Sequence, residues 1–324
     1  MSELDNFTPE LTADGSFTFF SQEFGESFHS HYGAKQESFF KFVEPTQLAV
    51  KAKCKPVLRL LDVCYGLGYN TAAALQTIWS VNPDCDVEVI GLEINTAVPQ
   101  SAIAHQLYEN WNYEYIYILR SIAHEQKVQT NRLKASLLIG DARKTVQQVY
   151  ASGFQADAIF LDPFSPPQCP QLWTIEFIQW LALCLQSDGI LATYSCAAAV
   201  RTALLAAGLQ IGSTPPVGRR SPGTVATHRE DTVTHRCGDT ESIVDRFAMS
   251  SSHPLLIASS PPLSQAEIEH LQTRAAIPYR DPQLTDSSEV ILRRRQQQQQ
   301  TSSLEPTSRW RKRWQSHRSD LHVK

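Results

Sequence analysis

The sequence lacks any apolar run that approaches the roughly 20 residues needed to cross a bilayer, so we expect no membrane association. The first ten residues, MSELDNFTPE, also lack the basic and apolar pattern of an export signal, and we expect a cytoplasmic protein. None of the seven cysteines forms a C-x-x-C pair, so the sequence indicates neither a zinc site nor a disulfide framework. What it does contain, 324 residues of which 42% are hydrophobic, is enough for a large core.

Charge is distributed unevenly along the chain. Residues 293–324 contain nine of the 29 Lys and Arg residues but two of the 33 acids, which leaves +7 there and −11 over residues 1–292. Glutamine, serine and arginine dominate this segment, and from that composition we expect 296–324 to be disordered. A basic tail could contact nucleic-acid phosphates, with Trp310 and Trp314 stacking on unpaired bases; a solvated tail without a partner is the alternative.

The most informative stretch lies at 57–74, VLRLLDVCYGLGYNTAAA. Its near-continuous apolar start predicts a strand buried on both faces of a parallel sheet. Gly66 and Gly68 follow, and then a helix-forming segment. Glycines at such a junction let the backbone approach a ligand closely, while the helix directs its free N–H groups at the same place. The pattern predicts a nucleotide-type pocket, although a purely structural turn is the alternative.

A second predicted strand, 87–92, ends at Glu93, which lies 25 residues after Gly68. An acid at this distance is placed to bind a ribose in a doubly wound fold. The third glycine of the dinucleotide pattern is absent, because Asn70 and Thr71 stand at that point. We therefore favour S-adenosylmethionine (SAM), which has no pyrophosphate, over NAD or FAD.

Acids also follow the next two predicted strands. Asp141 ends a strand at 135–140, where it could accept the amino group of adenine, cap the following helix, or do both. Asp162 ends a strand at 156–161 and opens the rigid loop D-P-F-S-P-P, the position where such folds place their chemistry. Trp173 begins a helix beside that loop and is either part of the core or a contact to a base.

The segment before the first strand of the nucleotide fold combines aromatic and polar residues. Residues 17–20 alternate like a strand, so we expect a short β extension. His29 and His31 could bind a metal, but no carboxylate or cysteine stands at ligand spacing, so we expect no metal site and favour surface or capping roles. Tyr32 and Glu37 could close over the pocket.

Strand and helix alternate with short connections, which predicts a Rossmann-like parallel α/β fold of the class I SAM-dependent methyltransferase type. We divide the chain into four parts: an N-terminal β extension (1–55), a methyltransferase domain (56–224), a C-terminal extension with a short helix (225–292), and a basic, Gln-rich disordered tail (293–324). Ser264 and Glu267 form a capping-box pattern at the start of that short helix.

Several stretches together resemble the methyltransferase half of MnmC and the stand-alone MnmC-like tRNA methyltransferases. They are DGSFTFFSQEFGESFHSHYGAKQES, LDVCYGLGYNT, GLEIN, LLIGDAR, IFLDPFSPPQCPQLWT, GILATYSCAAAVRTALLAAGL and PVGRRSPGT, and they span about 11–224 in family order. One departure is Pro163, where many members have Gly or Ala after the aspartate. Proline carries no N–H, so a backbone donor to the substrate at this position is excluded.

The resemblance implies SAM-dependent methylation of the 5-aminomethyl group of a tRNA wobble uridine, without an FAD-dependent oxidoreductase domain. From its position at the end of a strand, we expect Asp162 to be the catalytic residue, which orients the amine and accepts its proton; the alternative is that Asp162 only caps the following loop. The expected cofactor residues are Asp62, Gly66, Gly68, Asn70, Glu93, Asp141 and Ala142. The expected substrate residues are Tyr32, Glu37, Phe164, Trp173, Arg219 and Arg220. The alternatives are a SAM-fold enzyme for a small-molecule amine and a non-catalytic RNA-binding adaptor.

Overall fold

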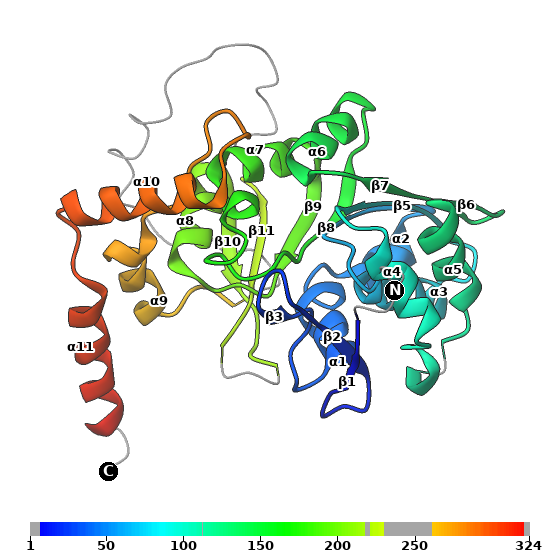
Figure 1. Cartoon of the computed structure of the whole chain (residues 1–324), viewed down its shortest axis with the longest axis horizontal. Coiled ribbons are helices and arrows are strands. Elements are labelled where there is room, and N and C mark those ends of the chain that lie inside the picture. The colour runs from blue at the N-terminus through cyan, green and yellow to red at the C-terminus, as the bar shows by residue number, and fades with distance from the viewer. Residues whose placement is uncertain (1–6, 112, 218–220, 230–260, 321–324) are drawn as a thin grey trace.

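The structure is a computed structural model, and it describes residues 7–111, 113–217, 221–229 and 261–320. Its centre is an eight-stranded sheet with the order β10-β11-β9-β8-β4-β5-β7-β6 (Figure 1). The strands are β4 (Val57–Val63), β5 (Asp86–Glu93), β6 (Lys127–Gln129), β7 (Leu133–Ile139), β8 (Ala156–Leu161), β9 (Leu185–Thr193), β10 (Leu209–Ser213) and β11 (Thr224–His228). The five strands from β7 to β9 run parallel, whereas β6, β10 and β11 pair antiparallel.

The chain reverses its direction of travel across the sheet at β4. It proceeds outward through β5 and β7, then returns to the other side of β4 with β8 and β9. Open α/β sheets bind ligands at such a reversal, beyond the carboxyl ends of the strands. Val63 pairs with Leu92 on one side and Leu161 on the other, so Glu93 and Asp162 leave the sheet at the same level.

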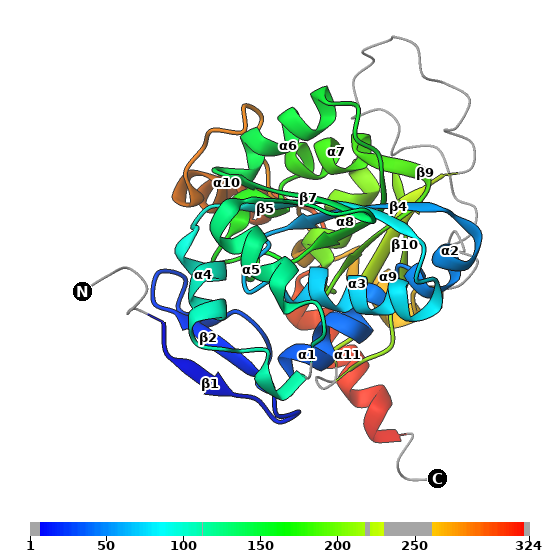
Figure 2. The same ribbon diagram turned by 90° about the vertical axis from the view of Figure 1, so that its right-hand side faces the viewer.

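Helices cover both faces of this sheet (Figure 2). One face carries α3 (Tyr69–Val81), α4 (Ala97–Ala104), η3 (Glu109–Trp111) and α5 (Ile116–Glu125). The other carries α6 (Ala142–Ala151), η4 (Pro170–Trp173), α7 (Ile175–Leu183) and α8 (Ala198–Ala206). β4 is buried against both layers, which explains its almost continuous apolar sequence. The predicted Rossmann-like α/β fold is confirmed. None of the helices described is long and apolar enough to span a membrane.

The N-terminal segment forms a separate three-stranded antiparallel sheet. Its strands are β1 (Pro9–Leu11), β2 (Phe17–Ser21) and β3 (Glu26–Ser27), and they are followed by α1 (Ala34–Glu37), η2 (Ser38–Val43) and α2 (Leu48–Cys54). The elements α1, η2 and α2 contact α3. This arrangement brings the small sheet to the carboxyl edge of the large one.

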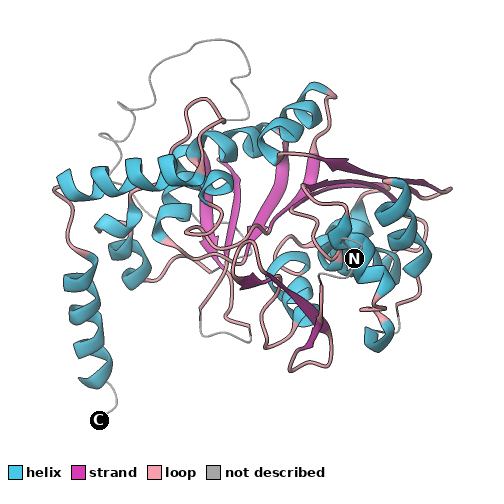
Figure 3. Ribbon diagram, in the orientation of Figure 1, coloured by secondary structure: helices cyan, strands magenta, loops and turns pink. Residues whose placement is uncertain are grey.

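The expectation of a disordered tail is wrong for the part of the chain that the structure describes. After α9 (Gln265–His270) and η7 (Arg274–Ala276), the chain forms α10 (Ser288–Thr301) and α11 (Thr307–Asp320) (Figure 3). The predicted capping box of Ser264 and Glu267 is present at the start of α9. The boundary that we predicted at 292/293 falls inside α10, so the two C-terminal parts form a continuous helical extension.

Arginine and tryptophan side chains hold these helices in place. Arg295 donates to the carbonyl oxygens of Ile277 and Ala275 and lies over the ring of Tyr279. Trp310 stacks on His270 with ring centroids 4.2 Å apart, so it is not available to stack on a base as we expected. The polar composition of this segment suggested disorder. The contacts that order it join residues distant in sequence, so the composition could not reveal them. Trp314 is likewise engaged, donating its Nε1 to Glu269.

Candidate active site

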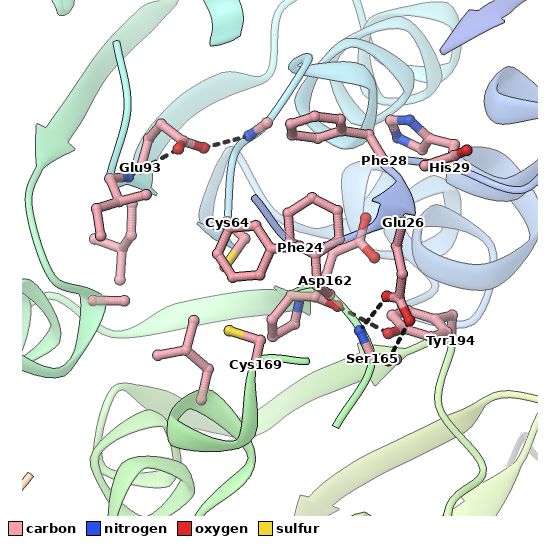
Figure 4. A pocket seen from close by; sticks show the side chains of 18 of the residues that line it. Phe24, Glu26, Phe28, His29, Cys64, Glu93, Asp162, Ser165, Cys169 and Tyr194 are labelled. Carbon is pink, nitrogen blue, oxygen red and sulfur yellow. Dashed lines mark hydrogen bonds between the residues drawn. The ribbon is translucent and has the colours of Figure 1, made fainter. Parts of the chain in front are cut away.

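A cavity of about 520 Å³ lies at the carboxyl ends of β4, β5, β7 and β8, and the N-terminal sheet closes it from above (Figure 4). A volume of this size is within the usual range for small-molecule sites. The residues of its wall used below are Phe24, Glu26, Phe28, His29, Glu37, Gly66, Glu93, Asp141, Ala142, Arg143, Asp162, Phe164 and Ser165.

The turn after β4 brings the backbone of Gly66 to the cavity wall. Gly66 has φ 55° and Gly68 has φ 84°, and α3 begins directly afterwards. A Cβ on Gly68 would lie 2.7 Å from the hydroxyl oxygen of Tyr65, so this position requires glycine for packing as well as for conformation. Gly66 instead faces the cavity, which makes it the glycine at which a ligand can approach the backbone.

Glu93 is nearly enclosed at the end of β5. Its carboxylate accepts hydrogen bonds from the backbone N–H groups of Gly66 (2.8 Å), Ile94 (2.9 Å) and Asn95 (3.0 Å). Burial raises its pKa, while these hydrogen bonds act in the opposite direction. A carboxylate has about four acceptor positions and three are occupied, so Glu93 retains capacity for a hydroxyl donor in the cavity. This geometry fits the ribose of the expected cofactor.

Asp141 is the N-cap of α6, which is one of the two roles predicted for it. It accepts from the backbone N–H of Arg143 at 2.9 Å, and the guanidinium of Arg143 binds both of its oxygens. Burial alone would raise the pKa of Asp141, but the hydrogen bonds from Arg143 hold it below its usual value. Arg143 also binds Asp281 at 2.8 Å and therefore ties the cavity wall to the C-terminal extension.

Asp162 begins the loop after β8. Asn70, in the first turn of α3, donates its Nδ2 to Oδ2 of Asp162 at 2.8 Å, which restricts the rotation of the carboxylate. The loop itself is held by a residue of η4 and by the residue that directly follows β9. Tyr194 donates to the carbonyl oxygen of Pro163, and Trp173 donates to that of Phe164, each at 2.9 Å. Asp162 is thus held rigidly on the wall that also contains Gly66 and Glu93.

The upper wall comes from the N-terminal segment and includes two residues, Phe24 and Glu26, that the sequence alone did not single out. Phe24 stacks on Phe164, and Glu26 accepts from the backbone N–H and the hydroxyl of Ser165. His29 is buried against the ring of Tyr69, and burial lowers its pKa to about 4, so the ring is neutral at pH 7. Their aromatic and acidic character was visible, but nothing local placed them over the loop after β8.

The structure sorts the predicted site residues into three groups. Those that line the cavity are Gly66, Glu93, Asp141, Ala142, Asp162, Phe164 and Glu37. Five lie outside its wall: Gly68, Asn70, Asp62, Trp173 and Tyr32. Asn70 acts through Asp162, and Asp62 accepts a hydrogen bond from Thr71 at 2.7 Å. Trp173 is fully buried, and Tyr32 is 58% exposed. Arg219 and Arg220 lie outside the described residues.

The two histidines proposed as possible metal ligands both line the cavity but differ in exposure. His29 is buried, whereas His31 is exposed and lies 3.2 Å from Ser27. Across the ranges that the structure describes, no three His, Cys, Asp or Glu side chains are grouped to hold a metal ion.

The fold and this cavity define a Rossmann-like SAM-dependent methyltransferase. A family model described as S-adenosyl-L-methionine-dependent methyltransferase matches residues 100–229. The crystal structure of MnmC2 from Aquifex aeolicus is 31% identical and superposes with a TM-score of 0.73, covering 92% of this chain and 86% of that one. The chain belongs to the MnmC2 family of methyltransferases.

Two curated relatives match over shorter spans. An uncharacterized protein of Methanocaldococcus jannaschii is 31% identical over 220 residues, which are 66% of this chain and 58% of that protein. The tRNA 5-methylaminomethyl-2-thiouridine biosynthesis bifunctional protein MnmC of Acidovorax sp. is 25% identical over 229 residues, 68% of this chain and 35% of that protein. The chain therefore spans less than two thirds of the length of these relatives.

Proposed function

We propose that this protein methylates the amine of a 5-aminomethyl group on the wobble uridine of tRNA, giving 5-methylaminomethyluridine, with or without a 2-thio group. The observation that carries the proposal is the position of Asp162. Its carboxylate is oriented by Asn70 and shares one cavity wall with Gly66 and Glu93. The name of the related MnmC proteins supports tRNA as the substrate.

The cofactor half of the cavity suits SAM, which when bound supplies an electrophilic methyl group. Glu93 holds the ribose through its remaining acceptor capacity, and the backbone of Gly66, which lines the cavity, lies against part of the cofactor. Asp141 and Ala142, at the start of α6, lie at the adenine end. These assignments rest on the shape and the donors and acceptors of the wall.

The substrate half must provide a neutral amine. A primary alkylamine is mostly protonated at pH 7, with the lysine pKa near 10.4 as a guide. Asp162 binds the ammonium group, accepts a proton from it, and leaves the nitrogen lone pair aligned for the transfer. Because methyl transfer is a displacement that depends on alignment, the fixed rotation of Asp162 contributes by orientation as well as by proton acceptance.

The test is an assay of purified protein with isotopically labelled SAM and tRNA that carries the 5-aminomethyl group, followed by mass spectrometry of the nucleosides. We expect label in 5-methylaminomethyluridine, and a loss of at least about 100-fold in kcat for Asp162→Asn with an unchanged affinity for S-adenosylhomocysteine. Methylation of small amines but not of tRNA would support a small-molecule enzyme instead. Binding of tRNA without any turnover would support an adaptor.

A further inference from the structure

The turn between β2 and β3 places two side chains against the loop after β8. The rings of Phe24 and Phe164 stack with centroids 4.4 Å apart and an angle of 17° between their planes. Next to them, Glu26 accepts from the backbone N–H of Ser165 at 2.9 Å and also from its hydroxyl. All four residues line the cavity, so these contacts close it between the two sheets.

The two sides of this contact are anchored differently. Phe164 belongs to a loop whose carbonyl groups are bound by Trp173, on η4, and by Tyr194, which directly follows β9. Phe24 belongs to a four-residue turn, residues 22–25, which is mostly exposed and contains Gly25 at φ 65°. The described contacts between this part of the chain and the loop include the ring stack, the hydrogen bonds of Glu26, and an edge-on contact of Phe28 with Phe164 at 5.0 Å between centroids. Asp162 is oriented separately, by Asn70 on α3.

The chemistry of the substrate matches these two side chains, and this step rests on the proposed function. The target is a flat pyrimidine that carries a cationic aminomethyl group. Unpaired bases are read by stacking on aromatic rings, and an ammonium group forms its strongest hydrogen bonds with carboxylates. Two stacked phenyl rings leave no space for a base between them, since a base would require roughly twice the present separation.

We propose that Phe24 and Glu26 form the second half of the substrate site. The incoming base takes a place between Phe24 and Phe164, so that one ring–ring contact is replaced by two ring–base contacts. Glu26 exchanges its neutral partner Ser165 for the ammonium group and holds the cation on entry, before Asp162 removes the proton. A charge-assisted hydrogen bond replaces a neutral one, which favours the exchange when the amine is present.

The proposal predicts separate effects on two tRNAs. Both are the same sequence, one with the 5-aminomethyl group and one as an unmodified transcript. Phe24→Ala should weaken both at least about fivefold, measured as KM for the first and Kd for the second, since each loses one stacked face. Glu26→Gln should raise KM for the aminomethyl tRNA at least about tenfold but leave Kd for the unmodified transcript unchanged, because only the first carries a cation.

A matched control lies in the same turn. Glu23 is exposed and does not line the cavity, so Glu23→Gln should behave as wild type with both tRNAs. Calorimetry with S-adenosylhomocysteine should give wild-type affinity for all three variants, which reports an intact fold.

Three results would overturn the proposal. Wild-type KM values for Phe24→Ala and Glu26→Gln would show that these residues do not contact substrate. Equal weakening of both tRNAs by Glu26→Gln would reduce Glu26 to a structural link to Ser165. In either case, methyl transfer by the wild-type protein would still support the proposed function. Absence of methyl transfer to the aminomethyl tRNA by the wild type itself would remove the proposed function and this inference together.

Discussion

Carboxylates around the cavity have the same chemistry but are placed in different environments. Asp62 is fully buried; Thr71 binds one of its oxygens, and the other has no hydrogen-bond partner among the residues that the structure describes. Glu93 is buried but receives three backbone donors. Asp141 is paired with an arginine, and Asp162 is oriented by an amide. The number and kind of donors around each group decide whether it is neutral, a binding anion or an available base.

Asp62→Asn should change the pH dependence of stability. Burial raises the pKa of Asp62 to about 7 from 3.8, so the folded state keeps a proton that the unfolded state releases. This contribution is complete below about pH 4 and is lost as the pH rises to about 7. Between pH 4 and pH 7, the free energy of unfolding of the variant relative to that of wild type should therefore rise by roughly 1–4 kcal/mol. Above pH 7 this difference should no longer change with pH.

Denaturant unfolding at pH 4 to 8 measures this difference. The exposed Asp84→Asn variant is the matched control and should follow the wild-type curve. A difference between Asp62→Asn and wild type that does not vary with pH would show that Asp62 is ionised in the folded protein.

Glu93→Gln should weaken binding of S-adenosylhomocysteine. The amide would direct a donor at backbone N–H groups that now face a carboxylate, and it would lose the charge that binds a ribose hydroxyl. The expected cost is about 1.5–3 kcal/mol, measured by calorimetry. Glu88→Gln, on the same strand but in a surface ion pair with Arg59 and Lys134, should bind normally. Equal affinity of Glu93→Gln and wild type would exclude the ribose role.

At the scale of elements, the C-terminal extension is attached to the methyltransferase fold by two arginines, of which Arg201 is buried and Arg143 is partly buried. Arg201, on α8, binds Glu267, which lies on α9. Arg143, on α6, binds Asp281, a fully buried residue in the segment between η7 and α10. The second link ends at the cavity wall, because Arg143 also holds Asp141. The extension therefore supports the position of the cap of α6.

Asp281→Asn should lower both stability and cofactor affinity. The carboxylate accepts from Arg143 and from the backbone N–H groups of Thr285 and Asp286, and the amide cannot replace the charge. We expect a loss of about 1–3 kcal/mol in the free energy of unfolding. A weaker affinity for S-adenosylhomocysteine should accompany it, since Arg143 would be less well fixed. The measurements are denaturant unfolding and calorimetry.

The exposed variant Glu289→Gln, on α10, provides the control and should stay within about 0.5 kcal/mol of wild type. If Asp281→Asn unfolds earlier yet binds the cofactor normally, the extension stabilises the fold without positioning the site.

For the whole molecule, the distribution of charge has to be reconciled with the polyanionic substrate that we propose. The first 292 residues carry −11, whereas residues 293–324 carry +7. Part of that positive charge is used internally, since Arg294 pairs with Asp286, and Arg313 pairs with Glu269 and Glu305. Arg311 and Lys312 are exposed on α11, in a helix that its tryptophans fix against α9. A fixed basic helix can position phosphates better than a disordered tail.

Replacing Arg311 and Lys312 together by Gln should raise KM for tRNA and flatten its dependence on salt. Each lost phosphate contact should reduce the log–log salt slope by roughly 0.7–0.9. The double variant Lys53→Gln with Lys127→Gln removes the same charge from exposed positions elsewhere and should leave the slope unchanged. Identical slopes for both double variants and wild type would mean that α11 takes no part in binding tRNA.

Patterns with a local cause could be read from the sequence. The buried strand, glycine turn and helix at 57–81 follow from apolar periodicity and backbone freedom, and the acids Glu93 and Asp162 follow from strand ends that must meet at one edge of a parallel sheet. The capping box at Ser264 is equally local, because donor and acceptor are three residues apart. These features were enough to predict the fold and the lower wall of the cavity.

Apart from Glu37, the tertiary structure alone decided the upper wall of the cavity, and it alone decided the conformation of the C-terminal segment. Glu26 meets Ser165 across 139 positions and Arg143 meets Asp281 across 138, distances over which no periodicity or propensity carries information. The helices after residue 288 were likewise hidden, since a Gln- and Arg-rich segment is ordered here by side chains that reach distant backbone carbonyls and by Trp310 on His270. Such contacts depend on how the sheet brings remote segments together, which a sequence pattern does not encode.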